Sequence, residues 1–214
     1  MNLSIVLNFL FPKKCRICYK RGKFEVCDNC IRRIKKFENF HILNLKNRNL
    51  DTLIYSFLYK GYIRKLILDF KFFGKYYLGK VFSQIMIKNE KLCRKLKFYD
   101  IIIPVPMHKL KKLERGYNQT EILSENLAEN LNIFYDKNIL IKVVNNKKQS
   151  SLSKNERYKN IKDVFKIEKT DKIKNKRIIL VDDICTTSAT LEECSKVLKE
   201  AGAIEVVALV IAKD

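Results

Sequence analysis

The sequence predicts an α/β protein with a mostly parallel sheet flanked by helices and a small cysteine-rich module before it. Three observations predict this architecture. From about residue 50 onward, strand-like and helix-like stretches alternate, as they do in proteins built from βαβ units. Residues 98–106 and 177–183 are strand-like and largely apolar, which is typical of strands buried in a parallel sheet. Four of the seven cysteines lie close together near the start of the chain.

The α/β domain begins with a strand and two helices. Residues 51–61 are rich in aromatic and other β-favouring residues and predict a strand that ends at Gly61. Residues 62–74 place apolar side chains on one helical face and end at Gly74, so they predict a helix. A second helix is expected over residues 76–94.

A buried strand and a third helix follow. Residues 98–106 predict a strand that stops at Pro104 and Pro106, because proline has no amide hydrogen to donate to a neighbouring strand. Residues 118–132 repeat leucine and alanine on one face and therefore predict a helix.

The last third of the chain alternates in the same way. Residues 139–144 and 163–167 predict short strands, and the polar stretch between them, residues 145–160, predicts a long mobile loop. Three elements complete the domain: a buried strand at 177–183, a helix at 188–202 and a final strand at 203–212.

Four cysteines predict a structural metal site. They form a C-x2-C-x8-C-x2-C pattern, in which each pair can turn two thiolates toward one point. Four thiolates leave no open position on Zn²⁺, so the predicted site is closed and structural. A redox role is the alternative, but it requires one C-x2-C motif beside a βαβ unit. The predicted ligands are Cys15, Cys18, Cys27 and Cys30.

Charge and hydropathy restrict the class of protein. The net charge of +21 is spread along the chain and would attract polyanions such as nucleic acid, anionic membranes or phosphorylated metabolites. A generally lysine-rich composition is the alternative explanation. The apolar run at the N-terminus is too short to span a bilayer and lacks the features of a signal peptide. We expect a cytoplasmic protein that does not span the membrane, with a short helix and the cysteine module in residues 1–48 and the α/β domain in residues 49–214.

The stretch IILVDDICTTSAT joins a buried strand to a helix through two carboxylates and several small hydroxyl residues. Ligands of parallel α/β sheets bind at the carboxyl ends of strands, so Asp182 and Asp183 are candidate ligand-binding residues with side chains on opposite faces. Residues 186–190 offer amides and hydroxyls at a helix N-terminus, which favours phosphate. The combination predicts a ribose phosphate ligand. The alternatives are a helix capped by Thr187 or Ser188 beside solvated aspartates, and a receiver domain, which the late position of the acid pair disfavours.

Several motifs resemble those of the ComF/GntX family. VDDICTTSAT resembles the phosphoribosyl pyrophosphate (PRPP) signature of type I phosphoribosyltransferases. IIIPVPMHKLKKLERGYNQTEILSENLA is similar to the family's PVP…RGxNQ segment, and KKQSSLSKNERYKNIKDVF is similar to its Q-x-x-L…R-x-x-N…F segment. The four-cysteine module is similar to the zinc-binding N-terminus of the same family. The resemblance covers nearly the whole chain and implies a type I phosphoribosyltransferase-like fold for residues 49–214.

The resemblance also implies roles for individual residues. Asp182 and Asp183 would hold the ribose hydroxyls, with or without Mg²⁺, and Arg115 would assist at the pyrophosphate. The other PRPP-binding residues that it implies are Thr186, Thr187, Ser188, Ala189 and Thr190 around the 5-phosphate, Pro104, Val105, Pro106 and Lys109 at the pyrophosphate, and Gln149, Arg157 and Asn160 in a loop that folds over the ligand.

Two residues depart from the family pattern. Ser188 stands where the family usually has glycine, so its backbone must avoid a positive φ or tolerate strain. Lys142 stands where arginine is common, which replaces a bidentate fork with a point charge. Both departures bear on turnover more than on binding.

The resemblance leaves more than one function open. We expect a PRPP-binding, phosphoribosyltransferase-like protein. One alternative is an active phosphoribosyltransferase that uses PRPP and Mg²⁺ on an unidentified acceptor in nucleotide metabolism, and the other is a catalytically inactive fold that serves as a zinc-stabilised scaffold for single-stranded DNA. The family implies a role in natural competence at the inner face of the membrane, with single-stranded DNA and DNA-uptake proteins as partners.

An aromatic segment near residues 70–77 suggests a second possible binding surface. Its aromatic residues alternate with lysines and could stack on nucleic-acid bases, although their helical spacing favours partial burial in the core. The residues are Phe70, Phe72, Phe73, Tyr76 and Tyr77.

Overall fold

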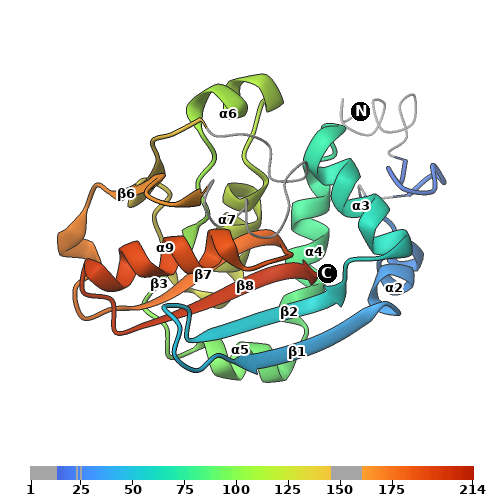
Figure 1. Ribbon diagram of the computed structural model, residues 1–214. Coiled ribbons are helices and arrows are strands. Elements are labelled where there is room, and N and C mark those ends of the chain that lie inside the picture. Colours follow the sequence, from blue (N-terminus) through green and yellow to red (C-terminus); the bar gives the residue numbers. More distant parts are fainter. Residues whose placement is uncertain (1–13, 23, 25, 146–160) are drawn as a thin grey trace, which may run out of the picture. The chain divides into compact units, whose positions relative to one another are not determined.

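The computed structural model describes residues 14–22, 24, 26–145 and 161–214 (Figure 1). The chain divides into two compact units, Met1–Glu38 and Asn39–Asp214. The boundary that the sequence places after residue 48 stays a prediction. The first unit contains the cysteine module and helix α2 (Asp28–Lys35), and the expected N-terminal helix lies outside the described residues.

The second unit is built on a six-stranded sheet. The strand order is β1-β2-β8-β7-β3-β4, and every pair from β2 to β4 is parallel. Strands β5 and β6 form a separate antiparallel pair. The strands are β1 (Glu38–Asn44), β2 (Thr52–Leu58), β3 (Ile101–Pro104), β4 (Phe134–Tyr135), β5 (Leu140–Lys142), β6 (Phe165–Ile167), β7 (Arg177–Cys185) and β8 (Glu205–Lys213).

Helices cover both faces of this sheet (Figure 1). On β7, Ile178 and Leu180 share one buried cluster with Leu191 and Leu198 of α9, whereas Ile179 and Val181 are buried toward the other face, where α7 packs together with α4. The helices of this unit are α3 (Gly61–Phe72), α4 (Tyr77–Ile87), α5 (Glu90–Leu96), α6 (Lys109–Arg115), α7 (Gln119–Leu131), α9 (Ala189–Glu200) and the short η2 (Thr170–Lys172).

The predicted fold class is confirmed, and the differences are local. The sequence predicts one helix over residues 76–94, but the structure has α4 and α5, because the Asn89 side chain accepts a hydrogen bond from the Leu92 amide at 3.2 Å and starts a new helix. Helix α6 and strands β1 and β4 were not predicted. Helix α6 spans seven residues, a segment too short for apolar periodicity to identify it as a helix in the sequence.

The strand connections identify where a ligand would bind. From β3 the chain passes through α7 to the edge strand β4, whereas from β7 it passes through α9 to β8 on the opposite side. Helices that leave neighbouring parallel strands in opposite directions open a crevice at the carboxyl ends of those strands. In this sheet the crevice lies between the end of β3 and the end of β7.

Candidate functional site

Asp183 is the buried acid of this crevice. It lies near the end of β7 with 3% of its surface exposed. The Lys71 ammonium of α3 lies 3.1 Å from its Oδ1 and 3.0 Å from its Oδ2, and the Gln119 side-chain amide of α7 donates to Oδ2 at 2.7 Å. Removing one partner of such a pair typically costs about 3 kcal/mol. Three separate segments are therefore held together at one carboxylate.

Lys71 is a functional candidate that the sequence did not identify. Burial alone would lower its pKa, but the charges of Asp183 and Asp182 raise it above the usual lysine value. The ammonium group is therefore charged at neutral pH and compensates the acid pair. Within the sequence, Lys71 is one of 44 lysine and arginine residues, so only the fold distinguishes it.

Asp182 faces a different environment from Asp183. Its Oδ1 accepts a hydrogen bond from the Asp183 amide at 2.7 Å, and its charge acts on Cys194 of α9 and Lys142 of β5. Asp183 instead contacts α3 and α7, so the two side chains lie on opposite faces, as alternation along a strand requires. Burial, with the nearby charge of Asp183, raises the pKa of Asp182 to about 7.

Lys142, where the resemblance expects arginine, lies on the Asp182 side of the site. Its ammonium lies 5.6 Å from the centre of the Phe165 ring. Burial lowers the pKa of Lys142 to about 8, and the charge of Lys111 acts in the same direction. At mildly basic pH Lys142 is therefore partly uncharged, whereas an arginine would keep its full positive charge.

Arg115 is connected to the acid pair through Gln119. Its guanidinium donates to Gln119 Oε1 at 2.6 Å, and Gln119 in turn donates to Asp183. The guanidinium also lies 5.1 Å from the centre of the Phe72 ring. Gln119 belongs to the RGxNQ motif, but the sequence assigned it no role; its position as the link between Arg115 and Asp183 comes from the structure.

The turn after β3 is fixed by the start of α7. The Val105 amide donates to Val181 O at 2.8 Å, and the Val105 carbonyl accepts from Thr120 Oγ1 at 2.7 Å and Asn118 Nδ2 at 3.3 Å. These bonds bring Val105 and Pro106 to the same crevice as Asp183. Lys109 is exposed at the start of α6, and no described contact joins it to the acid pair.

Residues 186–190 form the loop that leads from β7 into α9. Ser188 has φ 62° and ψ 0°, so it adopts the left-handed conformation that glycine adopts without strain; for serine this costs roughly 1 kcal/mol. Its side chain does not cap α9 but lies 3.2 Å from Cys185 Sγ. The alternative in which Ser188 serves only as a helix cap is therefore not supported.

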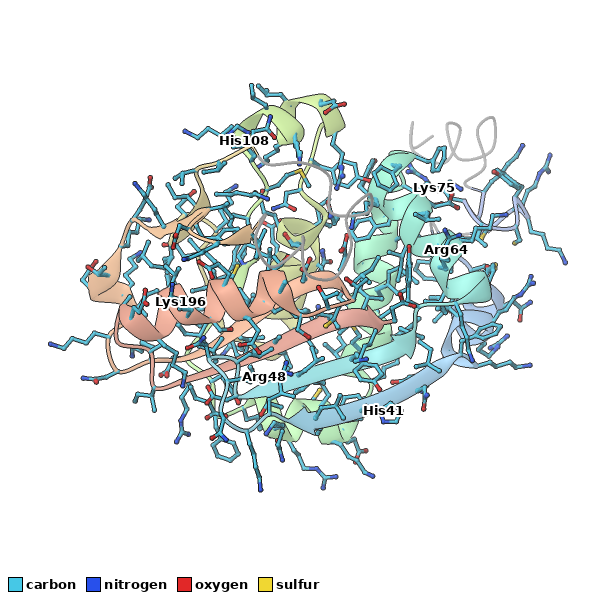
Figure 2. All side chains as sticks on the ribbon, viewed as in Figure 1. His41, Arg48, Arg64, Lys75, His108 and Lys196 are labelled. Carbon is cyan, nitrogen blue, oxygen red and sulfur yellow. The ribbon has the colours of Figure 1, made fainter. Side chains whose placement is uncertain are left out.

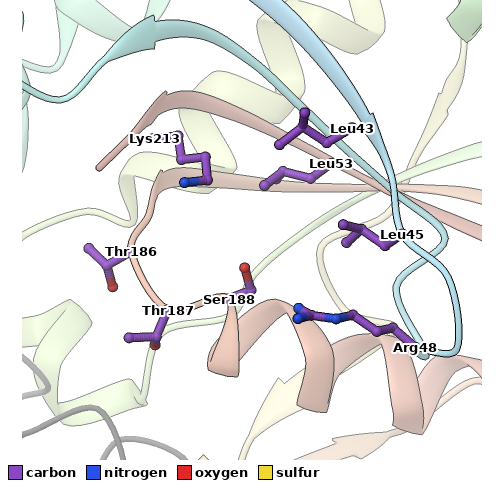
Figure 3. Close-up of a pocket in the computed structure, with 8 residues that line it drawn as sticks. All are labelled: Leu43, Leu45, Arg48, Leu53, Thr186, Thr187, Ser188 and Lys213. Carbon is purple, nitrogen blue, oxygen red and sulfur yellow. The ribbon is translucent and has the colours of Figure 1, made fainter.

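A hollow of about 410 Å³ borders this loop (Figure 3). Its other side is formed by the β1–β2 segment and the end of β8. Arg48 reaches into it with the guanidinium toward the loop (Figure 3) and pairs with Glu192 of α9 at 3.6 Å. The lining residues are Leu43, Leu45, Arg48, Leu53, Thr186, Thr187, Ser188 and Lys213.

The four cysteines of the first unit converge as predicted. Their sulfur atoms all lie within 4.8 Å of one another, with 3.7 Å between Cys15 and Cys30 and 3.8 Å between Cys18 and Cys27. Four sulfurs placed about 2.3 Å from a central tetrahedral ion would be about 3.8 Å apart. The Cys27 amide also points at Cys15 Sγ, at 3.4 Å. The cluster can hold a metal ion.

The predicted loop residues Gln149, Arg157 and Asn160 lie outside the described residues, and their roles stay predictions. No helix in the described part of the chain is long and apolar enough to cross a membrane.

Comparisons with known proteins place these features in context. Residues 118–214 match the phosphoribosyl transferase domain family. The chain is 30% identical to competence protein F of Haemophilus influenzae over 211 residues, which covers 96% of this chain and 90% of that protein. It is 29% identical to competence protein ComFC of Bacillus subtilis, covering 88% of this chain and 72% of that protein. It is 26% identical to DNA utilization protein YhgH of Escherichia coli strain K12, covering 66% and 63% respectively.

Solved structures include a distant likeness. Glutamine PRPP amidotransferase from B. subtilis, complexed with ADP and GMP, has a TM-score of 0.43 and 18% identity, covering 67% of this chain and 30% of that chain.

The raised pKa of Asp182 predicts a pH-dependent stability. The folded chain keeps the Asp182 proton up to about pH 7, whereas the unfolded chain loses it near 3.8, so the free energy of unfolding decreases as pH rises through this interval. Asp182→Asn does not titrate and should be more stable than the wild type at pH 8, by about 1 kcal/mol or more. Urea unfolding at pH 4 and pH 8 measures the difference, with exposed Asp171→Asn as the control. A variant no more stable than the wild type at pH 8 would contradict the prediction.

Proposed function

The chain belongs to the ComF family of phosphoribosyltransferase-like proteins, and from this premise we propose that it binds PRPP with Mg²⁺ and takes part in handling incoming single-stranded DNA during natural competence. The observation that most supports PRPP binding is the buried carboxylate of Asp183 at the crevice between β3 and β7, one loop before α9. The names of the relatives, competence protein and DNA utilization protein, support the second part.

Each part of PRPP has a chemical counterpart at this crevice. The ribose hydroxyls would donate to the carboxylates of Asp182 and Asp183. The 5-phosphate would lie in the loop of residues 186–190, at the positive end of the α9 dipole. The pyrophosphate would lie by Val105 and Pro106, within reach of Arg115. Lys109 completes the set that we assign to the pyrophosphate.

The acid pair also fits Mg²⁺, because carboxylate oxygens are the protein ligands this ion prefers. Bound Mg²⁺ would neutralise the pyrophosphate and the developing charge on it. Lys71 already places one positive charge on Asp183, so cation binding at this carboxylate requires that the lysine side chain withdraw. With 26% of its side chain exposed, Lys71 has a path to solvent, from which it can reach a phosphate.

Displacement of pyrophosphate from PRPP does not require a nucleophile from the protein. Cleavage of the ribose C1–O bond leaves positive charge on the sugar and negative charge on the leaving group, so a site catalyses it by electrostatic stabilisation and exclusion of water. Arg115 and Lys71 can stabilise the leaving group. The strained Ser188 and the point charge of Lys142 bear on turnover, so a PRPP-binding scaffold without turnover remains the alternative to an active phosphoribosyltransferase with an unidentified acceptor.

Calorimetry tests the PRPP site. PRPP with Mg²⁺ should bind the wild type, and Asp183→Ala should weaken binding by about 100-fold, since a charged hydrogen-bond acceptor for the ribose is lost. The exposed acid Asp171 provides the matched control, and Asp171→Ala should bind as the wild type does. Pyrophosphate release, assayed with nucleobases, amines and single-stranded DNA as acceptors, separates turnover from binding alone. Absence of heat from PRPP with the wild type would end the proposal.

We propose that the ion of the four-cysteine cluster is a structural Zn²⁺. Metal analysis should find one zinc per chain, and a chelator that removes it should lower the melting temperature, since folding of such modules is coupled to the metal. Cys27→Ser should lose zinc. Cys93→Ser, which changes a cysteine that donates to the Ile87 carbonyl outside the cluster, should retain it. Equal zinc content in the two variants would refute the assignment.

Single-stranded DNA binding should depend steeply on salt. If about four phosphates are neutralised by lysine or arginine, affinity falls about 50-fold between 50 and 200 mM salt, as counterions are no longer released favourably. Fluorescence anisotropy with a labelled oligo-dT measures this, and an uncharged peptide nucleic acid of the same length is the control. Feeble binding even at low salt would contradict the proposed role with DNA.

A further inference from the structure

The turn between α3 and α4 exposes three aromatic rings. Phe70 is fully buried, but Phe72 is 57% exposed, Phe73 is 69% exposed and Tyr76 is 51% exposed. The aromatic segment is therefore divided: one face completes the core and the other faces solvent. Phe72, Phe73 and Tyr76 are called the aromatic ledge below. Large apolar side chains exposed together on one turn are often part of an interaction surface.

The turn that presents the ledge is held by specific contacts. Gly74 adopts φ 65°, which ends α3 and is accessible to glycine without strain. Lys75 pairs with Asp69 at 2.7 Å across the turn, beside α3 in Figure 2. The Leu78 amide then donates to the Lys75 carbonyl at 3.0 Å. The rings are thus presented from a fixed backbone, which lowers the entropic cost of binding.

The ledge is connected to the acid pair. The Arg115 guanidinium lies 5.1 Å from the centre of the Phe72 ring and reaches Asp183 through Gln119 in two hydrogen bonds. Lys71, the residue before Phe72, contacts Asp183 directly. A ligand that lies on Phe72 is therefore close to the residues that contact the proposed PRPP site.

The chemistry of the ledge favours unpaired nucleobases. Aromatic rings beside lysine and arginine are the recurring means of binding single strands, in which bases stack on rings and phosphates meet cations. Small-molecule sites instead enclose most of their ligand in a concavity, whereas each ring of the ledge is more than half exposed. A base on this surface needs additional contacts through its own backbone, which a strand supplies and a free base does not.

We infer that the aromatic ledge binds single-stranded DNA by stacking its bases on Phe72 and Phe73, beside the acid pair. The inference rests on the proposed DNA role and adds the place and the mode of contact. The strand would run past the mouth of the PRPP crevice, with its phosphates near Arg115 and Lys75.

The test compares leucine substitutions at two ends of the molecule. Phe72→Leu combined with Phe73→Leu keeps apolar side chains but removes the aromatic faces. Phe98→Leu is the matched control, because Phe98 also follows a lysine and is 70% exposed. It precedes β3 and therefore lies at the amino ends of the parallel strands, whereas the acid pair lies at their carboxyl ends. Circular dichroism and melting temperature verify that each variant is folded.

Anisotropy with oligo-dT over a range of salt concentrations is the readout. The double variant should bind about tenfold more weakly at every salt concentration with an unchanged salt slope, because stacking is lost and no charge is altered. Phe98→Leu should bind as the wild type does. An abasic oligomer of the same length should bind all three proteins equally.

Three outcomes would overturn the inference. Equal oligo-dT binding by the double variant and the wild type would refute the ledge alone and leave the DNA role standing. Displacement of the labelled oligomer by free thymidine would show that the ledge is a subsite for a single nucleoside and not a surface for a strand. If the wild type bound no DNA, the proposed DNA role would fall together with the ledge, and the PRPP calorimetry would report separately on the acid pair.

Discussion

Compensation of one buried carboxylate organises the candidate site. Asp183 lies almost wholly out of water at the end of a central strand, and an unpaired charge there would cost several kcal/mol, roughly the margin by which a domain is stable. Lys71 forms an ion pair with this carboxylate and Gln119 donates a hydrogen bond to it, so its charge is compensated. They are 112 and 64 residues from Asp183 in the sequence, so α3 and α7 must both be in place before the carboxylate is compensated.

This compensation can be exchanged without opening the core. The Lys71 side chain is partly exposed, whereas the Asp183 side chain is 4% exposed, so the lysine can withdraw while the carboxylate stays fixed. In the proposed PRPP complex, a metal cation or the ribose hydroxyls would take the place of the ammonium, because each supplies positive charge or donors to the same oxygens. Under this proposal Asp183 is a rigid acceptor with a replaceable partner, and the strand itself need not move when the ligand binds.

The sequence predicted what depends on local pattern and left out what depends on distant contacts. The cysteine spacing sufficed for the four-sulfur cluster, and the VDD stretch sufficed for the position of the acid pair at a strand end. Lys71 could not be selected, because a lysine on an amphipathic helix is ordinary until the fold places it against Asp183. Helix α6 was not predicted because its seven residues are too few to show a helical pattern. The aromatic segment was predicted to be partly buried, but which of its rings face solvent depends on the turn at Gly74.

Two energetically unfavourable features near the end of β7 support the proposal that this region binds a ligand. Ser188 holds a left-handed backbone that a non-glycine residue adopts only with strain, and Asp182 carries a raised pKa because burial and Asp183 disfavour its charge. Neither feature strengthens the sheet, and each lowers the stability of the unliganded chain. A helix start that merely needed a cap would be more stable with a capping side chain, which Ser188 does not provide. Backbone strain and an unfavourable buried charge within one strand-to-helix segment are typical of sites whose surrounding structure is arranged to hold a ligand.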